Sequence, residues 1–153
     1  MHRLSIVAAL VLLAACSSSR DEPSRAELEA IRAAQNVFPA NYKAEIMAFL
    51  RNYLNDPTGI RNAAVSQPQV KDLPTGARYV ACLRYDAKKA NGQYAGSRTA
   101  LVVFISGKLD RFVEPQPGRE TRDGSSAGEG AEVREACKDA VLAPFPELQR
   151  LSR

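Results

Sequence analysis

Between Thr99 and Ile105 the chain reads Thr-Ala-Leu-Val-Val-Phe-Ile, which is apolar at every position after the threonine. A short apolar run bounded by turn residues is typical of a strand covered on both faces, so we expect this segment at the centre of a sheet. Ser106-Gly107-Lys108 favours a tight turn. Residues 109–114 are therefore expected to return as the partner strand of a hairpin.

Two further strands are expected before this hairpin. Residues 78–86 are rich in Tyr, Val and Leu and alternate between two faces. One face carries Tyr79, Ala81, Leu83 and Tyr85. A weaker strand is expected at residues 60–66, ahead of a proline.

Helical patterns flank the expected strands. Ser24 and Glu27 fit a capping box for a helix over residues 26–35, whose few large apolar residues predict loose docking. Residues 42–54 form the strongest helical pattern, with Asn41 as the expected cap and a disruptive Asn55-Asp56-Pro57-Thr58-Gly59 after it. The apolar stripe of this helix consists of Tyr42, Ile46, Phe49, Leu50, Tyr53 and Leu54.

A last helix is expected over residues 131–142, before Pro144-Phe145-Pro146 ends it. The order of these elements predicts an α+β fold, in which an antiparallel sheet of three to four strands is covered by helices from both ends of the chain.

The composition is that of an ordinary globular protein, with 45% hydrophobic and 25% charged residues among 153. This length supports one core, which excludes multidomain enzyme architectures. We expect a single domain over residues 24–153. Residues 115–130 lack periodicity and are rich in Gly and Pro, so a mobile loop is expected there.

Residues 1–15 have the features of a secretory signal peptide. A short positive start precedes an apolar run that is too short to span a bilayer. The run ends in Leu13-Ala14-Ala15-Cys16, which resembles the lipobox of bacterial lipoproteins. The resemblance implies acylation of Cys16 with palmitate-like chains and a lipidated tether over residues 16–23. The alternative is an ordinary secretory signal with Cys16 as an incidental thiol or a disulfide partner.

The residue after the expected acylated cysteine is Ser17. In lipoproteins of this kind an Asp at that position favours retention in the inner membrane, so the resemblance implies the periplasmic face of the outer membrane. The expected partners are the membrane, through the lipid anchor, and an envelope protein. Nucleic acid is not an expected partner, because the net charge of +4 is small and the basic residues are scattered.

Cys82 and Cys137 are the two cysteines outside the lipobox. In an oxidising envelope, this pair predicts a disulfide. Two buried free thiols are the alternative. A catalytic cysteine is not expected, because the only histidine, His2, lies in the expected signal peptide.

We expect no metal, no cofactor and no catalytic residues. The expected mature chain has no His, no CxxC pair, no Asp-rich calcium loop and no glycine-rich phosphate loop. Glycan hydrolysis needs a pair of carboxylates, and the spacing of the candidates singles out no pair. These candidates are Glu45, Asp56, Asp86 and Glu114.

Two stretches in the middle of the chain carry a second resemblance. Tyr53-Leu54-Asn55-Asp56-Pro57-Thr58-Gly59 is similar to a helix ending in an L-x-D-P-x-S turn. Residues 82–96 are similar to V-C-G-x-V-N-A-K-N-x-x-G-G-Y-x-G. Together they resemble a family of small bacterial envelope domains without an assigned activity, over residues 53–105, which implies a similar fold and compartment. The matching positions are Asp56, Pro57, Cys82, Ala87, Lys88, Gly92, Tyr94 and Gly96.

The connection over residues 86–98 is the expected interaction surface, because two strands anchor it. Its candidate binding residues are Arg84, Lys88, Tyr94 and Arg98. The alternative, which the sequence favours over a recognition loop, is a solvated hairpin whose tyrosine covers the edge of the core. Two functions remain open: a lipid-anchored binding or scaffold module of the envelope without catalytic activity, which we favour, and a small hydrolase acting on cell-wall or lipid material.

Overall fold

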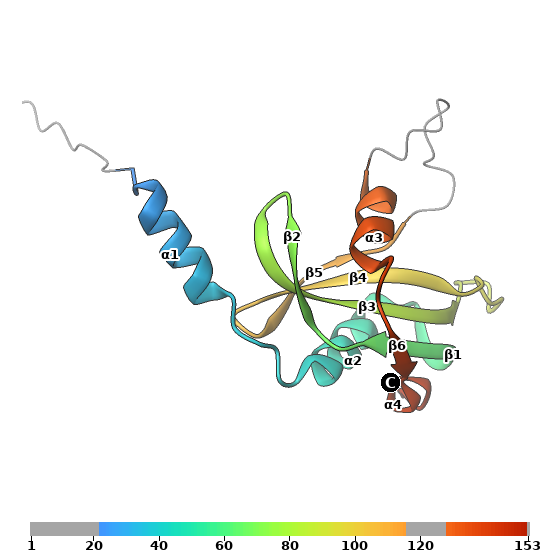
Figure 1. Cartoon of the computed structure of the whole chain (residues 1–153). Helices are drawn as coiled ribbons and strands as arrows, with labels where there is room; N and C mark the ends of the chain where they lie inside the picture. The colour runs from blue at the N-terminus through green and yellow to red at the C-terminus, as the bar shows by residue number, and fades with distance from the viewer. Residues whose placement is uncertain (1–21, 116–127, 153) are drawn as a thin grey trace, which may run out of the picture.

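The computed structural model of the chain describes residues 22–115 and 128–152. Residues 1–15, the lipobox and most of the tether lie outside the described residues, as does nearly all of the loop expected over residues 115–130. Figure 1 shows one twisted sheet with helices packed against it, apart from the first helix, which extends away. The elements are α1 (Arg25–Gln35), α2 (Tyr42–Tyr53), β1 (Asp56–Ser66), β2 (Gln69–Leu73), β3 (Gly76–Lys88), β4 (Arg98–Ile105), β5 (Lys108–Val113), α3 (Glu129–Cys137), β6 (Leu142–Pro144) and α4 (Pro146–Gln149).

The sheet is antiparallel throughout, with the strand order β5-β4-β3-β1-β6, and β2 pairs with β3 beside this path. The expected α+β class and antiparallel sheet are confirmed. The expected number of three to four strands is wrong, since the sheet has six. The two unexpected strands are β2, which is polar and forms a hairpin with the first part of β3, and β6, which has only three residues and includes a proline.

Strand β3 organises the fold because it pairs with β1, β2 and β4. Its 13 residues alternate between two faces as expected. Ala81, Leu83 and Tyr85 are buried on one face, whereas Val80 and Cys82 are buried on the other. The apolar run expected to be covered on both faces is indeed strand β4, which is buried from Ala100 to Phe104. The sheet therefore has a core on each side.

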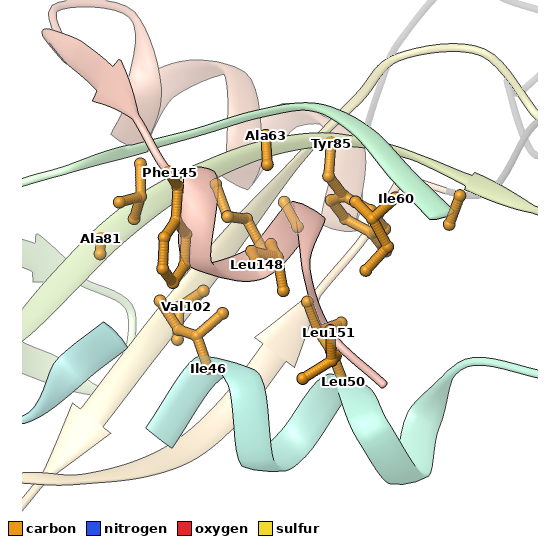
Figure 2. Packing of buried hydrophobic residues seen from close by; sticks show 14 of the residues in the cluster. Ile46, Leu50, Ile60, Ala63, Ala81, Tyr85, Val102, Phe145, Leu148 and Leu151 are labelled. Atoms are coloured by element: carbon orange, nitrogen blue, oxygen red, sulfur yellow. The ribbon is translucent and has the colours of Figure 1, made fainter. Parts of the chain in front are cut away.

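The larger core lies between the sheet and the helices α2 and α4 (Figure 2). Ile46 and Leu50 of α2 are fully buried there. The end of the chain supplies the opposite wall, with Phe145, Leu148 and Leu151. The Phe145 backbone N–H donates to the Ala63 carbonyl oxygen at 2.8 Å, which fixes the start of α4 against β1.

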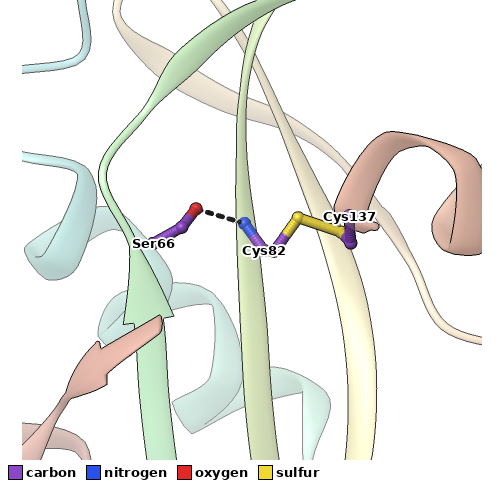
Figure 3. Close-up of a disulfide and its surroundings, with 3 residues drawn as sticks. All are labelled: Ser66, Cys82 and Cys137. Carbon is purple, nitrogen blue, oxygen red and sulfur yellow. Dashed lines mark hydrogen bonds between the residues drawn. A yellow bond between two sulfur atoms is a disulfide. The ribbon is translucent and has the colours of Figure 1, made fainter. Parts of the chain in front are cut away.

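The smaller core lies under α3 and contains the disulfide. Cys82 of β3 and Cys137 of α3 are bonded, with the sulfur atoms 2.01 Å apart (Figure 3). Val133 and Ala136 of α3 are buried beside the bridge. The backbone N–H of Cys82 donates to the Ser66 hydroxyl at 2.9 Å. The expected Cys82–Cys137 pairing is thus present, and it joins α3 to the central strand.

Helix α1 extends away from the sheet (Figure 1). Ser24 and Glu27 form the expected capping box, with both reciprocal hydrogen bonds present. The helix has no buried residue. The expectation of loose docking is confirmed, but α1 does not cover the sheet. Cover comes instead from α2 against β5, α3 against β4 and α4 against β1.

Several expected boundaries were wrong. Asn41 lies at the N-terminus of α2, but its side chain makes no capping hydrogen bond. The strand expected over residues 60–66 begins earlier, at Asp56, within the segment expected only to end the preceding helix. Helix α3 ends at Cys137 rather than near residue 142, since the chain turns to pair β6 with β1. No helix in the described parts of the chain is long and apolar enough to cross a membrane.

Candidate functional site

A cavity of about 380 Å³ opens at the end of the sheet where β3 leads into the β3–β4 connection. It is bounded by the C-terminus of α2, the last residues of β3, the first residue of β4 and the residue after β5. We call it the β3–β4 cleft. Its lining residues are Tyr53, Leu54, Asn55, Tyr85, Ala87, Lys88, Lys89, Ala90, Arg98 and Glu114.

Glu114 is the carboxylate of this cleft, and its side chain is only 10% exposed. The Tyr85 hydroxyl donates to one carboxylate oxygen at 3.0 Å, and the Tyr53 hydroxyl donates to the other at 3.4 Å. A guanidinium nitrogen of Arg98 lies 3.3 Å from the same carboxylate. Burial raises the pKa of Tyr85 above its ordinary value, and the neighbouring Glu114 charge raises it further. Tyr85 therefore stays a hydrogen-bond donor to Glu114.

Lys88 connects the cleft to the start of β1. Its ammonium lies 3.2 Å from the Asp56 carboxylate. Asp56 also accepts hydrogen bonds from the hydroxyl of Thr58 at 2.6 Å and from its backbone N–H at 3.0 Å. These bonds, with the one from Lys88, lower the pKa of Asp56 from 3.8 to about 2. The polar Asp-Pro-Thr sequence therefore anchors β1 rather than presenting a free carboxylate.

The lowered pKa of Asp56 makes its contribution to stability depend on pH. The charged form is favoured in the folded state, so its stabilising effect is present above about pH 4 and is lost as the pH falls toward about 2. The hydroxyl of Thr58 is the largest cause. We therefore expect Thr58→Val to raise the pKa of Asp56 more than Lys88→Gln does, as measured by NMR titration of the carboxyl carbon. An equal or larger effect of Lys88→Gln would contradict this assignment.

Tyr94 lies outside the cleft, over the irregular first half of β1. Its hydroxyl donates to the Gly59 carbonyl oxygen at 2.8 Å. The Arg61 guanidinium stacks on its ring, 3.7 Å from the centroid. Gly59 has a φ of +69°, and a Cβ there would lie 3.3 Å from both the Lys88 ammonium and the Tyr94 hydroxyl. Tyr94 thus fastens the β3–β4 connection to β1.

Removing the Tyr94 hydroxyl is expected to weaken this attachment. Tyr94→Phe keeps the ring under Arg61 and loses only the bond to Gly59, so the free energy of unfolding should fall by about 1 kcal/mol. Tyr94→Ala should cost more, because the contact with Arg61 is lost as well. Urea denaturation measures both variants. A Tyr94→Phe variant as stable as the wild type would show that the hydroxyl contributes nothing.

The structure brings together two of the four expected binding residues. Lys88 and Arg98 line the same cleft, whereas Tyr94 is not among its lining residues and is hydrogen-bonded to β1. Arg84 is exposed on β3 and lines a separate shallow hollow with Asn62 and Ser97. The sequence pattern did not indicate Tyr53 or Tyr85 as part of a site, since each belongs to an apolar pattern expected to serve the core. Glu114 was indicated only as one of four candidate carboxylates, whose spacing singles out no pair.

The four candidate carboxylates each have partners within the fold. Glu45 bonds to Lys108 at 2.8 Å, and Asp86 accepts from the Gly96 backbone N–H at 2.8 Å. Asp56 and Glu114 are bound as described above. Among the residues lining the cleft, Glu114 is the single carboxylate. The described residues contain no group of three His, Cys, Asp or Glu side chains placed to hold a metal ion.

Comparison of the chain with known protein families, with curated proteins and with solved structures finds no match.

Proposed function

We propose that this chain is a lipid-anchored binding or scaffold module of the bacterial envelope, without catalytic activity. In this proposal acylated Cys16 holds the domain at the periplasmic face of the outer membrane. The Leu13-Ala14-Ala15-Cys16 sequence and the following Ser17 support the anchor and the membrane. Two or more acyl chains hold a protein on a bilayer far more firmly than a single chain does.

The observation that carries the proposal is the Cys82–Cys137 disulfide. Structural disulfides persist in oxidising compartments and are rare where thiols are kept reduced. The bridge therefore agrees with an envelope location, on evidence independent of the N-terminal sequence.

The binding role is supported by the β3–β4 cleft. Its cationic side chains belong to strands and to a hydrogen-bonded turn. In this turn the Lys89 N–H donates to the Gln93 carbonyl oxygen and the Gly92 N–H donates to the Lys89 carbonyl oxygen. A preformed site loses little conformational freedom on binding. The alternative function, a small hydrolase, would rely on Glu114, which two tyrosine hydroxyls and Arg98 already hold. The binding module is therefore the better supported function.

Acylation of Cys16 is the first test of this proposal. Metabolic labelling with a palmitate analogue should mark the wild-type chain and should be lost in Cys16→Ala. Ser18→Ala is the matched control, and it should label like the wild type. Outer-membrane fractions should contain the wild type and lack Cys16→Ala. Equal labelling of wild type and Cys16→Ala would overturn the anchor.

The binding role has its own test. Cross-linking in intact cells, followed by purification of the acylated protein from detergent-solubilised envelopes, should recover a specific envelope component. Recovery should fall when Lys88 and Arg98 are both replaced by Gln. Capture that is unaffected by this double variant would remove the cleft from the binding role.

A further inference from the structure

The β3–β4 cleft has more positive charge than three other cavities of the described chain. Three cationic side chains, those of Lys88, Lys89 and Arg98, line it together with one carboxylate. The cavity between β2 and α3 is lined instead by two lysines and three acidic residues. The hollow at the start of α2 has one lysine and one glutamate. The hollow around Arg84 has that one cation and no acidic residue. The cleft, with three cations and one carboxylate, therefore has the largest excess of positive charge among these four cavities.

The negative charge of the cleft is largely shielded. Glu114 accepts hydrogen bonds from Tyr53 and Tyr85 and pairs with Arg98. Asp56, which pairs with Lys88, is not among the lining residues. A guanidinium carries five N–H donors and an ammonium carries three, so these pairs leave donors for a further acceptor. Lys89 adds an exposed ammonium from the turn.

The remaining lining of the cleft is mainly apolar. Leu54, Ala87 and Ala90 line it together with Tyr53. A volume of about 380 Å³ is at the lower end of the range for small-molecule sites. The combination fits a compact ligand with one charged group and a short apolar part.

From this arrangement we infer that the β3–β4 cleft binds a small anionic molecule, whose carboxylate or phosphate group is held by Lys88, Lys89 and Arg98. The apolar part of the ligand packs on Leu54 and Tyr53. Hydrogen bonds between charged groups are about twice as strong as neutral ones, so the anionic group supplies most of the specificity. This inference rests on the proposed binding role and names the class of ligand for it.

The test uses the full-length protein in a non-ionic detergent and two pairs of probes. Acetyl-alanyl-alanine is compared with its C-terminal amide, and glycerol phosphate is compared with glycerol. Within each pair the compounds differ mainly in negative charge. Titrations are followed by the NMR shifts of the backbone amides of Lys88, Lys89 and Arg98. At least one charged probe should give saturable shifts, with a Kd on the order of 1 mM, and its neutral counterpart should give none.

The identity of the active probe distinguishes a carboxylate ligand from a phosphate ligand. Lys89→Gln should weaken its binding about tenfold, the loss expected for one charge-assisted hydrogen bond. Lys138→Gln is the matched control, because Lys138 is exposed on the far side of the sheet and pairs with Glu135. It should bind like the wild type.

Three results would overturn the inference: no shift with either charged probe, equal binding of the neutral counterparts, or equal weakening by Lys138→Gln. Failure here is distinct from failure of the proposed function, since acylation of Cys16 and capture of an envelope component do not depend on these probes.

Discussion

Replacing Cys82 and Cys137 together by alanine is expected to lower the free energy of unfolding by about 4 kcal/mol. The bridge closes a loop of 55 residues. Without the bridge the unfolded chain gains conformational entropy, and for a loop of this length that gain predicts a loss of about 4 kcal/mol. The free energy of unfolding of a single domain is about 5–15 kcal/mol, so the variant would lose a large part of its stability. For a domain of this size the melting temperature should fall by about 15 °C.

Chemical denaturation of the oxidised wild type, the reduced wild type and the alanine variant measures this effect. Reduction should reproduce most of the loss while keeping both sulfur atoms in the smaller core, which separates the covalent bond from packing. Reductant should leave the alanine variant unchanged. A reduced wild type as stable as the oxidised one would refute a stabilising bridge.

A comparable loss is expected for Phe145→Ala, at the start of α4. Phe145 is fully buried between α2 and the sheet. Replacing a buried phenylalanine by alanine removes its transfer free energy and leaves a cavity, at a cost of about 3–5 kcal/mol. The variant should therefore melt at least 10 °C lower, by roughly the same conversion.

Val141→Ala is the matched control for Phe145→Ala. Val141 lies four residues earlier, and its side chain is 86% exposed. Its replacement should change the free energy of unfolding by less than about 0.5 kcal/mol. Thermal unfolding followed by circular dichroism compares the three proteins. A small effect of Phe145→Ala would mean that the C-terminal segment is not part of the core.

The sequence predicted the elements whose side-chain period is strong. The alternation around Cys82 and the apolar run of β4 placed two central strands correctly, and the stripe of α2 placed the helix that covers them. It failed for elements that depend on distant partners. β6 forms because residues 142–144 reach β1. The sequence pattern indicates Phe145 only as part of a helix stop, although it is among the most buried residues.

The candidate site was predicted only in part, for a similar reason. Lys88 and Arg98 flank one connection, so their proximity follows from a hairpin. Tyr53 and Glu114 come from the ends of α2 and β5, and only the folded sheet brings them to Tyr85. A local pattern contains no signal for such a meeting. The cleft as a whole is therefore defined only by the tertiary structure.

The C-terminal segment also has a consequence for the order in which the domain can fold, because it completes both the edge of the sheet and the larger core. Ala64 of β1 pairs with Pro144 of β6, and Leu148 and Leu151 cover Ile46 and Leu50. Synthesis and export both deliver a chain N-terminus first, so α2 and β1 emerge before these partners. Until then the growing chain exposes an unpaired strand edge and an apolar helix face, the features on which holding chaperones and proteases act. Only when residues 142–151 are available can β6 pair with β1 and the C-terminal leucines cover the apolar face of α2.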